Sequence, residues 1–275
     1  MAGYPLGTST MSYIYSHAAI DCLDFLSKQG FRRYELCIFP PHFWPAEKTA
    51  TERRDFFRQV QDRGLTITSL CFPLNDNNMN SVLPEIRKTT LEMYKQVIDL
   101  AGEWKIPYVL VLPGAVHAYF RPPFEWLLEW FAQGLRVLAD QAQSVGTQLL
   151  VENVQYTFLP TVKHIVEALD KIGDKRVGMN YDVGNAIIAG CNPPEDLRLM
   201  MDRIKLVHLA DVAMPDIRKV AIGKGKIDFK AIADTFRSIN YSGPSMLEIV
   251  TDQDRSEKFA TSIVALKKMG WDLTA

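Results

Sequence analysis

The sequence has no apolar run long enough to cross a bilayer, and its first ten residues, MAGYPLGTST, lack the basic and apolar segments of a signal peptide. Its four cysteines lie far apart in the chain, and no two of them form a CxxC pair. This spacing argues against a disulfide framework or a zinc knuckle and favours reduced thiols. We therefore expect a cytoplasmic protein that does not enter a membrane.

The chain also has no excess charge of one sign. It carries 31 lysines and arginines against 32 aspartates and glutamates, a net charge of −1. No broad positive field is available to attract nucleic acid or an anionic membrane. Glycine-rich phosphate loops are missing as well, because GKGK at 223–226 is too short for a P-loop and no GxGxxG follows the first predicted strand. Both observations weaken a nucleotide-binding function.

What the chain does have is a regular alternation of short β-branched runs and longer amphipathic stretches, without a linker between them. The runs predict strands at 5–11, 32–39, 65–72, 108–114, 148–154, 177–183, 204–211 and 244–250. The stretches between them predict helices at 17–30, 52–64, 82–103, 123–146, 161–173, 194–203, 228–240 and 255–269. Eight strand–helix units in 275 residues predict a single (β/α)8 TIM barrel domain over 1–275. A doubly wound open sheet is the alternative that fits the same pattern.

Polar residues stand near the carboxyl ends of the last four predicted strands. They are Glu152 in LLVENV, Asp182 in MNYDVGN, His208 in LVHLAD and Glu248 in MLEIV. In a barrel, side chains at these ends converge on one site. Three carboxylates and an imidazole would repel one another and be costly to bury without a cation, so the set predicts a divalent metal. A ligand set rich in oxygen suits Mn²⁺, Mg²⁺ or Co²⁺, and Zn²⁺ is also compatible.

Each of these residues alone also fits an ordinary structural role. An aspartate at a strand end often caps the next helix, as Asp182 would, and a histidine in an apolar strand often belongs to the core. The occurrence of all four on consecutive strands favours the shared metal site.

The motifs LLVEN, NYDVGN, VHLAD, GKGKIDFKAIADTFRSINYSG and LEI together resemble the sugar isomerase/epimerase family with a xylose-isomerase-like barrel. The stretch 74–114, with its asparagine-containing loop and its strand ending in Pro-Gly, is similar to that family's third and fourth units. The resemblance spans essentially the whole chain. It implies one divalent metal, with Mn²⁺ expected first, held by Glu152, Asp182, His208 and Glu248. It also implies that Glu152 and Glu248 are the acid/base pair, that the substrate is a small sugar, and that the chain forms dimers or tetramers.

The chemistry expected of such a site is proton transfer next to a carbonyl group. A metal bound to the carbonyl and a neighbouring hydroxyl stabilises an enediolate, and carboxylates remove and return the proton. Return to the same carbon from the other face gives epimerisation, and return to the neighbouring carbon gives isomerisation. Other functions stay open: a metal-dependent lyase or dehydratase on a sugar-like substrate, and a non-catalytic barrel. A DNA-repair nuclease of the apurinic-endonuclease type is disfavoured, because it needs several metal ions and more histidines than the five present.

The chain departs from the epimerase pattern at two positions. Many family members carry histidine three residues after the second ligand and arginine about six residues after the metal histidine, where this chain has Asn185 and Met214. Either Arg218, four residues further on, does the work of that arginine from a longer loop, or the substrate differs from that of the epimerases. The substrate contacts that we expect, alongside the alternative that each is an ordinary loop residue, are Asn185, Arg218, His117 and Lys224. Asn153 and Asp211 are expected behind the ligands, with Asp211 ordering a loop or capping a helix.

Overall fold

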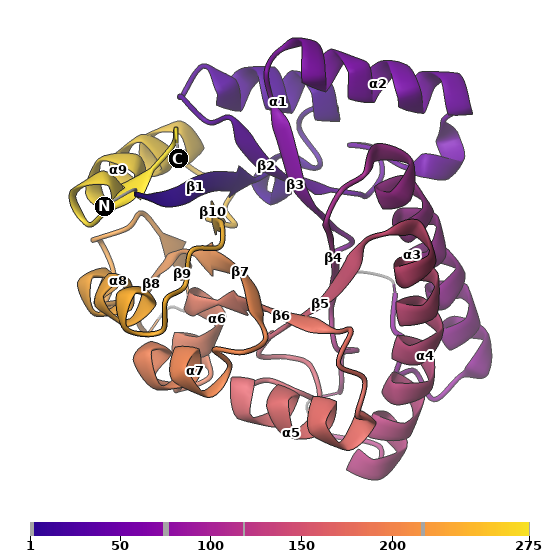
Figure 1. Ribbon diagram of the computed structural model, residues 1–275. Coiled ribbons are helices and arrows are strands. Elements are labelled where there is room, and N and C mark those ends of the chain that lie inside the picture. Colours follow the sequence, from indigo (N-terminus) through magenta and orange to yellow (C-terminus); the bar gives the residue numbers. More distant parts are fainter. Residues whose placement is uncertain (1–2, 74–76, 118, 216–217, 275) are drawn as a thin grey trace.

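The computed structural model describes residues 3–73, 77–117, 119–215 and 218–274. Eight parallel strands form a closed barrel, because β10 hydrogen-bonds with β7 on one side and β1 on the other (Figure 1). The barrel strands are β1 (Tyr4–Ser9), β2 (Arg33–Cys37), β3 (Thr66–Cys71), β4 (Tyr108–Val111), β5 (Gln148–Glu152), β6 (Gly178–Asp182), β7 (Ile204–Leu209) and β10 (Ser245–Leu247). The short strand β11 (Trp271–Asp272) pairs with β1 outside this ring. The predicted TIM barrel is confirmed.

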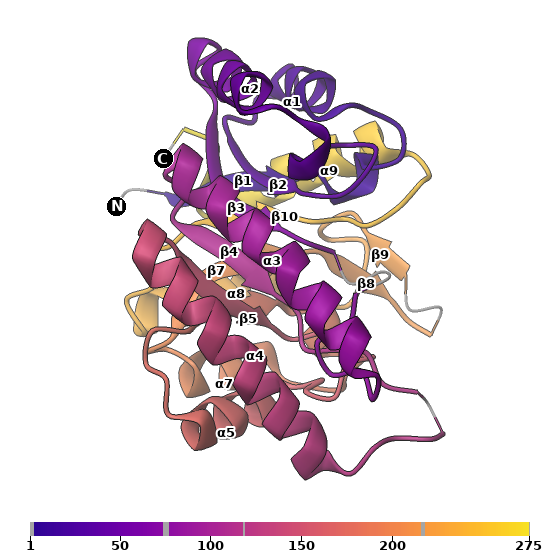
Figure 2. The ribbon, with the colours of Figure 1, turned by 90° about the vertical axis from the view of Figure 1, so that its right-hand side faces the viewer.

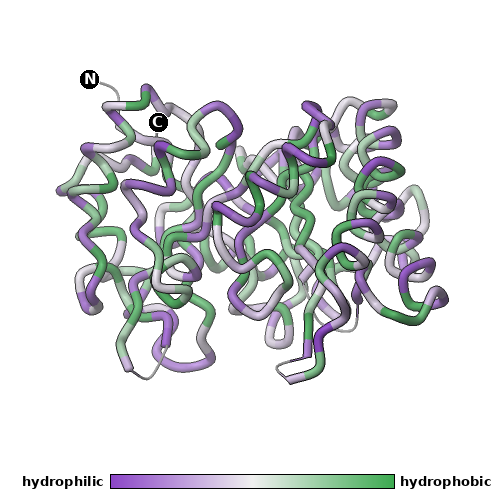
Figure 3. The backbone as a smooth tube through the Cα atoms, turned by 90° about the horizontal axis from the view of Figure 1, so that it is seen from below, coloured by the Kyte–Doolittle hydropathy of each residue, from purple (hydrophilic) through white to green (hydrophobic). Residues whose placement is uncertain are grey.

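Helices surround the barrel on its outer side (Figures 1 and 2). They are α1 (Ala19–Ser27), α2 (Ala50–Asp62), α3 (Pro84–Trp104), α4 (Phe124–Val145), α5 (Val162–Ile172), α6 (Val183–Ile188), α7 (Pro193–Leu199), α8 (Phe229–Ser238) and α9 (Arg255–Lys268), with 3-10 turns η1 (Met11–Tyr13) and η2 (Pro45–Glu47). Hydrophilic and hydrophobic residues alternate along the coils at the outside of the molecule (Figure 3), as helices with one face on the strands require. No helix in the described ranges is long and apolar enough to cross a membrane.

The inside of the barrel is closed by an apolar layer directly beneath the polar strand ends. Side chains two residues apart on a strand point to the same face. Leu150, Leu206 and Met246 each precede a predicted ligand by two residues, and all three are fully buried in one cluster with Cys37, Cys71 and Leu110. Because side chains on a strand alternate with a period of two, these apolar residues form a floor inside the barrel and the predicted ligands lie one layer above it.

The boundaries differ from the prediction where the chain turns at the barrel rim. The strand predicted over 5–11 ends at Ser9, because the chain then forms η1. The strand predicted over 204–211 ends at Leu209, and a separate antiparallel hairpin follows, made of β8 (Asp211–Ala213) and β9 (Arg218–Val220). This hairpin, α6 and β11 were not predicted. Segments of two to six residues carry too few side chains to show a periodic pattern.

Candidate metal centre and active site

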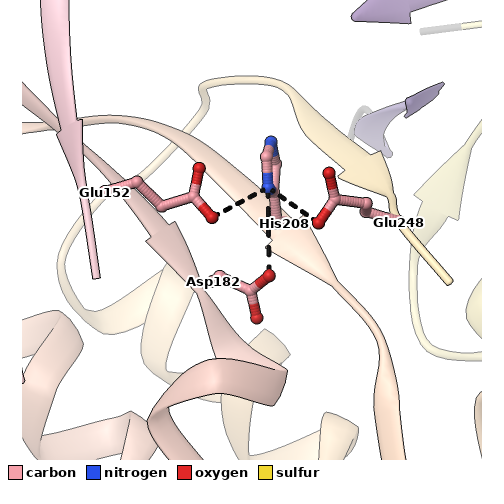
Figure 4. A group of neighbouring side chains, drawn as sticks. All are labelled: Glu152, Asp182, His208 and Glu248. Carbon is pink, nitrogen blue, oxygen red and sulfur yellow. Dashed lines mark ion pairs between the residues drawn. The ribbon is translucent and has the colours of Figure 1, made fainter. Parts of the chain in front are cut away.

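Four side chains converge above the apolar floor, at the carboxyl ends of neighbouring strands. Glu152 and Asp182 end β5 and β6, His208 lies in β7, and Glu248 directly follows β10. The strand register places Asp182 beside His208. One ligand atom from each of the four residues lies within 4.8 Å of the others, and all four residues are buried (Figure 4). The barrel thus brings the predicted ligands together in one cluster.

The orientation of His208 fits it for a metal. Its Nε2 lies 3.0 Å from Oε2 of the buried Glu35, which also accepts a hydrogen bond from Ser69 Oγ at 2.9 Å. Because Nε2 donates to this carboxylate, the other ring nitrogen faces the cluster. Nδ1 lies 3.4 Å from Glu248 Oε2, 3.7 Å from Glu152 Oε1 and 4.0 Å from Asp182 Oδ2.

This nitrogen is buried and has no hydrogen-bond partner within the described part of the chain. A buried nitrogen without a partner, aimed at three carboxylate oxygens, is the arrangement that a divalent cation satisfies. The set of three oxygen ligands and one nitrogen fits Mn²⁺, Mg²⁺ or Co²⁺, and it also fits Zn²⁺. The four residues therefore can hold a divalent metal, with Glu35 fixing the ring of the histidine ligand.

Asp182 caps a helix and also faces the cluster. Its Oδ1 caps α6 by accepting a hydrogen bond from the backbone N–H of Asn185 at 2.7 Å, while its Oδ2 faces His208. Asn153 joins the ends of β5 and β6, because its Oδ1 accepts from Asp182 N and its Nδ2 donates to Asp182 O, both at 2.9 Å. The amide of Asn185 in turn donates to the Asn153 carbonyl at 3.0 Å. The cap and the amide bonds fix the aspartate carboxylate in place.

Lys219, which was not among the predicted site residues, also reaches the cluster. Its Nζ lies 2.7 Å from Asp182 Oδ2 and 3.0 Å from Glu248 Oε2, and its side chain is 11% exposed. It comes from β9, where register with β8 turns it inward while its neighbour Arg218 is exposed. The short hairpin leaves no signal in the sequence that would select Lys219 over Arg218.

Burial and neighbouring charges shift the pKa values of the two candidate acid/base residues in opposite directions. Burial raises the pKa of Glu152 to about 7, against the lowering influence of His208. Burial also acts to raise the pKa of Glu248. The positive charges of Lys219 and His208 outweigh burial there and hold the pKa of Glu248 well below its usual range. Burial also opposes the charged form of His208, yet the carboxylates of Glu35, Glu248 and Glu152 raise the pKa of His208 well above its usual value. In the metal-free protein near neutral pH, Glu152 is therefore close to the midpoint of its titration, whereas Glu248 is ionised.

A cavity of about 790 Å³ opens onto the cluster. Its described lining includes Glu152, Glu248 and Lys219, with Tyr156 and Tyr15 toward the rim. This volume is ample for a small carbohydrate. A substrate in the cavity would lie against both candidate acid/base carboxylates.

The remaining predicted contacts divide between the cavity and the surface. Asn185 and Arg218 line the cavity. His117 is exposed, and its Nδ1 accepts hydrogen bonds from the backbone of Tyr119 and Phe120, both at 3.1 Å. Lys224 is exposed on the loop after β9. The structure therefore places two of the four predicted substrate contacts at the cavity and leaves the other two on the surface.

Asp211 lies behind the site and orders the loop that carries GKGK. The carboxylate is fully buried, and it accepts backbone hydrogen bonds from Val212 (2.9 Å), Gly223 (2.9 Å), Gly225 (2.8 Å) and Ile227 (3.1 Å). A Cβ on Gly225 would come within 2.2 Å of Asp211 Oδ1, so this close approach requires glycine. The glycines of the loop thus wrap a buried carboxylate and do not bind phosphate through a P-loop.

The fold and the site together define a class of protein. It is a TIM barrel with a buried cluster of carboxylates and a histidine at the carboxyl ends of its strands. The sequence pattern of the xylose isomerase-like TIM barrel matches residues 23–269. The chain belongs to this family, as its motifs predicted.

Curated relatives of the chain include carbohydrate epimerases and dehydratases. The chain is 24% identical to a putative L-ribulose-5-phosphate 3-epimerase, SgbU, of Escherichia coli, over 74% of this chain and 73% of the relative. It is 23% identical to the D-psicose 3-epimerase of Enterocloster bolteae, over 82% and 75% of the two chains. It is also 23% identical to an inosose dehydratase of Clostridium tetani, over 90% and 87%. The relatives thus span two reaction types.

Solved structures share the fold over nearly the whole chain. A D-tagatose 3-epimerase-like protein superimposes with a TM-score of 0.82 at 21% identity, covering 96% of both chains. The IOLI protein, solved with a bound zinc atom, superimposes with a TM-score of 0.79 at 17% identity, covering 96% of both chains. At these identities the likeness establishes the fold.

Proposed function

We propose that the protein is a divalent-metal-dependent epimerase or isomerase of carbohydrates that transfers a proton at the carbon next to a carbonyl group. The observation that carries the proposal is the pair Glu152 and Glu248, buried on either side of His208 and open to one large cavity (Figure 4). The relatives named as sugar epimerases support the same reaction class.

The metal-ligand set assigns each residue a task. Glu152, Asp182, His208 and Glu248 would hold the ion, with Mn²⁺ as the metal expected first. When bound, the metal supplies a positive charge that polarises the substrate carbonyl and stabilises negative charge on the neighbouring oxygens. Glu35 keeps the histidine ligand in one orientation through its bond to Nε2.

The two glutamates move the proton. Glu248 takes the proton from the carbon next to the carbonyl, and the electron pair of that bond moves into the carbonyl to give an enediolate. Glu152, on the other side of His208, returns a proton to the substrate. Return to the same carbon from the opposite face inverts that centre. Return to the former carbonyl carbon gives an isomer, provided that the hydroxyl proton on the neighbouring carbon moves to the former carbonyl oxygen.

Hydrogen exchange tests this proposal directly. The protein is loaded with Mn²⁺ and incubated in D₂O with a panel of ketoses, keto-sugars and their phosphates, and deuterium is located by NMR. We expect deuterium at a carbon next to the carbonyl of at least one sugar, with loss of exchange in Glu248→Gln. Exchange that is equal in the variant, or absent over the whole panel with metal bound, would contradict the proposal.

A second candidate is a dehydratase, which is favoured by the inosose dehydratase relative that covers 90% of this chain. The same enediolate can expel a hydroxyl from the adjacent carbon, so both reactions begin with proton removal by Glu248. Loss of 18 Da from the sugar, seen by mass spectrometry in the same incubations, would assign the dehydratase. A metal nuclease is not supported, because the described residues hold a single cluster of four ligands.

A further inference from the structure

The ammonium group of Lys219 contacts the same carboxylate oxygens that face the histidine ligand. It lies 2.7 Å from Asp182 Oδ2 and 3.0 Å from Glu248 Oε2. These are the aspartate and glutamate oxygens that approach His208 Nδ1, at 4.0 and 3.4 Å. The lone pairs expected to bind the metal are thus already engaged by an internal cation.

A metal and an ammonium group compete for these oxygens, because both are cations. A hard divalent cation takes carboxylate oxygens at about 2.0–2.6 Å. An ammonium group about 3 Å from the same oxygens would then stand within a few ångströms of a dication, in a buried site where like charges repel strongly. An ammonium group has no lone pair with which to bind the metal itself. Metal binding therefore acts against the contacts of Lys219 with these oxygens.

We propose that Lys219 and the divalent metal are alternative cations for Asp182 and Glu248, and that metal binding releases the lysine into the substrate cavity. The inference rests on the metal site proposed above. Once released, the ammonium group donates hydrogen bonds to hydroxyl or carbonyl oxygens of a carbohydrate in the cavity that Lys219 already lines. The lysine would then contact the substrate only when the metal is in place.

The placement of Lys219 allows this exchange without disturbing the barrel. The residue lies on β9, which pairs only with β8 in a two-stranded sheet outside the barrel ladder. Its long side chain enters the cluster from the cavity side, and rotation about its flexible stem withdraws the ammonium group. Backbone bonds from the loop to Asp211 hold the base of the hairpin meanwhile.

Metal affinity is the first test. Mn²⁺ is titrated calorimetrically into the wild-type protein, Lys219→Met and Lys226→Met, each stripped of metal. Met keeps the length of the side chain and removes its charge. We expect Lys219→Met to bind Mn²⁺ at least about tenfold more tightly, because no internal cation competes. Lys226, an exposed lysine on the following loop, controls for the change in net charge and is expected to leave the affinity unchanged.

The reactivity of the lysine in the wild-type protein is the second test, and it needs no variant. Reductive methylation is followed by mass spectrometry with and without saturating Mn²⁺. We expect Lys219 to react several-fold faster with Mn²⁺ bound, while Lys226 reacts at one rate in both conditions. A Lys219 rate that is unchanged or slower with Mn²⁺ would show that the lysine stays on the carboxylates.

The outcomes separate this inference from the proposed function. If the wild-type protein binds Mn²⁺ and Lys219→Met binds it equally or more weakly, the inference is wrong and the metal site stands. If neither protein binds any divalent metal, both proposals fail. Binding by Lys219→Met alone would contradict the release of Lys219 by metal and the metal site proposed for the wild-type protein, because the lysine would then exclude the metal altogether.

Discussion

His208 on β7 donates from Nε2 to Oε2 of Glu35 on β2, at 3.0 Å across the barrel interior. This bond leaves Nδ1 as the nitrogen that faces the three carboxylates of the cluster. A carboxylate behind a histidine ligand sets the tautomer of the ring and strengthens its basicity. Glu35 would therefore support metal binding through the ring of His208, without being one of the ligands.

Glu35→Gln is expected to weaken Mn²⁺ binding by about 10- to 100-fold, because the amide can still accept the hydrogen bond but carries no charge. Calorimetric titration measures the affinity, and thermal unfolding checks that the variant is folded. Ser69→Ala removes the hydroxyl that donates to Glu35 but leaves the charge of Glu35 in place. A smaller loss of Mn²⁺ affinity is therefore expected. Wild-type affinity in Glu35→Gln would show that Glu35 has no role at the metal.

Gly225→Ala is expected to disturb the loop that Asp211 orders, because the new Cβ would lie 2.2 Å from Asp211 Oδ1. Breaking bonds to a buried carboxylate costs about 2 kcal/mol or more, which corresponds to a melting temperature lower by roughly 4 °C or more. Lys224→Ala, one residue earlier and exposed, is the matched control and is expected to melt with the wild type. Equal melting of Gly225→Ala would mean that the loop adapts freely.

His42 is expected to make stability depend on pH. Its Nδ1 donates to the His17 carbonyl at 2.7 Å, and burial lowers the pKa of His42 from 6.5 to about 4. The folded protein thus binds fewer protons at this site than the unfolded chain. The stabilising contribution is fully present above about pH 6.5 and is lost as the pH falls toward 4, by on the order of 3 kcal/mol.

Denaturant unfolding of metal-free protein between pH 4 and pH 7 measures this effect. In His42→Gln, whose amide can make similar hydrogen bonds without titrating, we expect a shallower loss of stability on acidification. The difference between the two profiles isolates the histidine from the carboxylates that titrate in both proteins. Parallel profiles would show that His42 does not titrate differently in the folded protein.

The barrel and the four converging residues were predictable because both follow from patterns longer than any single contact. Eight apolar strands alternate with eight amphipathic helices, and a polar residue near the end of each of four consecutive strands must face the same rim. Asp182 shows that a local structural role and a place in the cluster are compatible, because it caps α6 with one carboxylate oxygen and faces His208 with the other.

Glu35 and Lys219 were missed for different physical reasons. Glu35 stands in a strand buried on both faces, and a charged residue there is itself a signal of a buried partner. The identity of that partner depends on a contact across the barrel, which strand order alone does not give. Lys219 depends on the register of a three-residue hairpin strand, and a slip of one residue would have turned Arg218 inward instead.

The most direct test of the central claim is the number of divalent ions that the chain binds. Mn²⁺ is titrated into metal-free wild-type protein and into His208→Gln, and bound metal is counted by equilibrium dialysis with elemental analysis. We expect one Mn²⁺ per chain in the wild type and none held with comparable affinity in the variant, because the imidazole Nδ1 supplies the only nitrogen of the ligand set. Three ions per chain, or one ion that is unaffected by the loss of His208, would contradict the account.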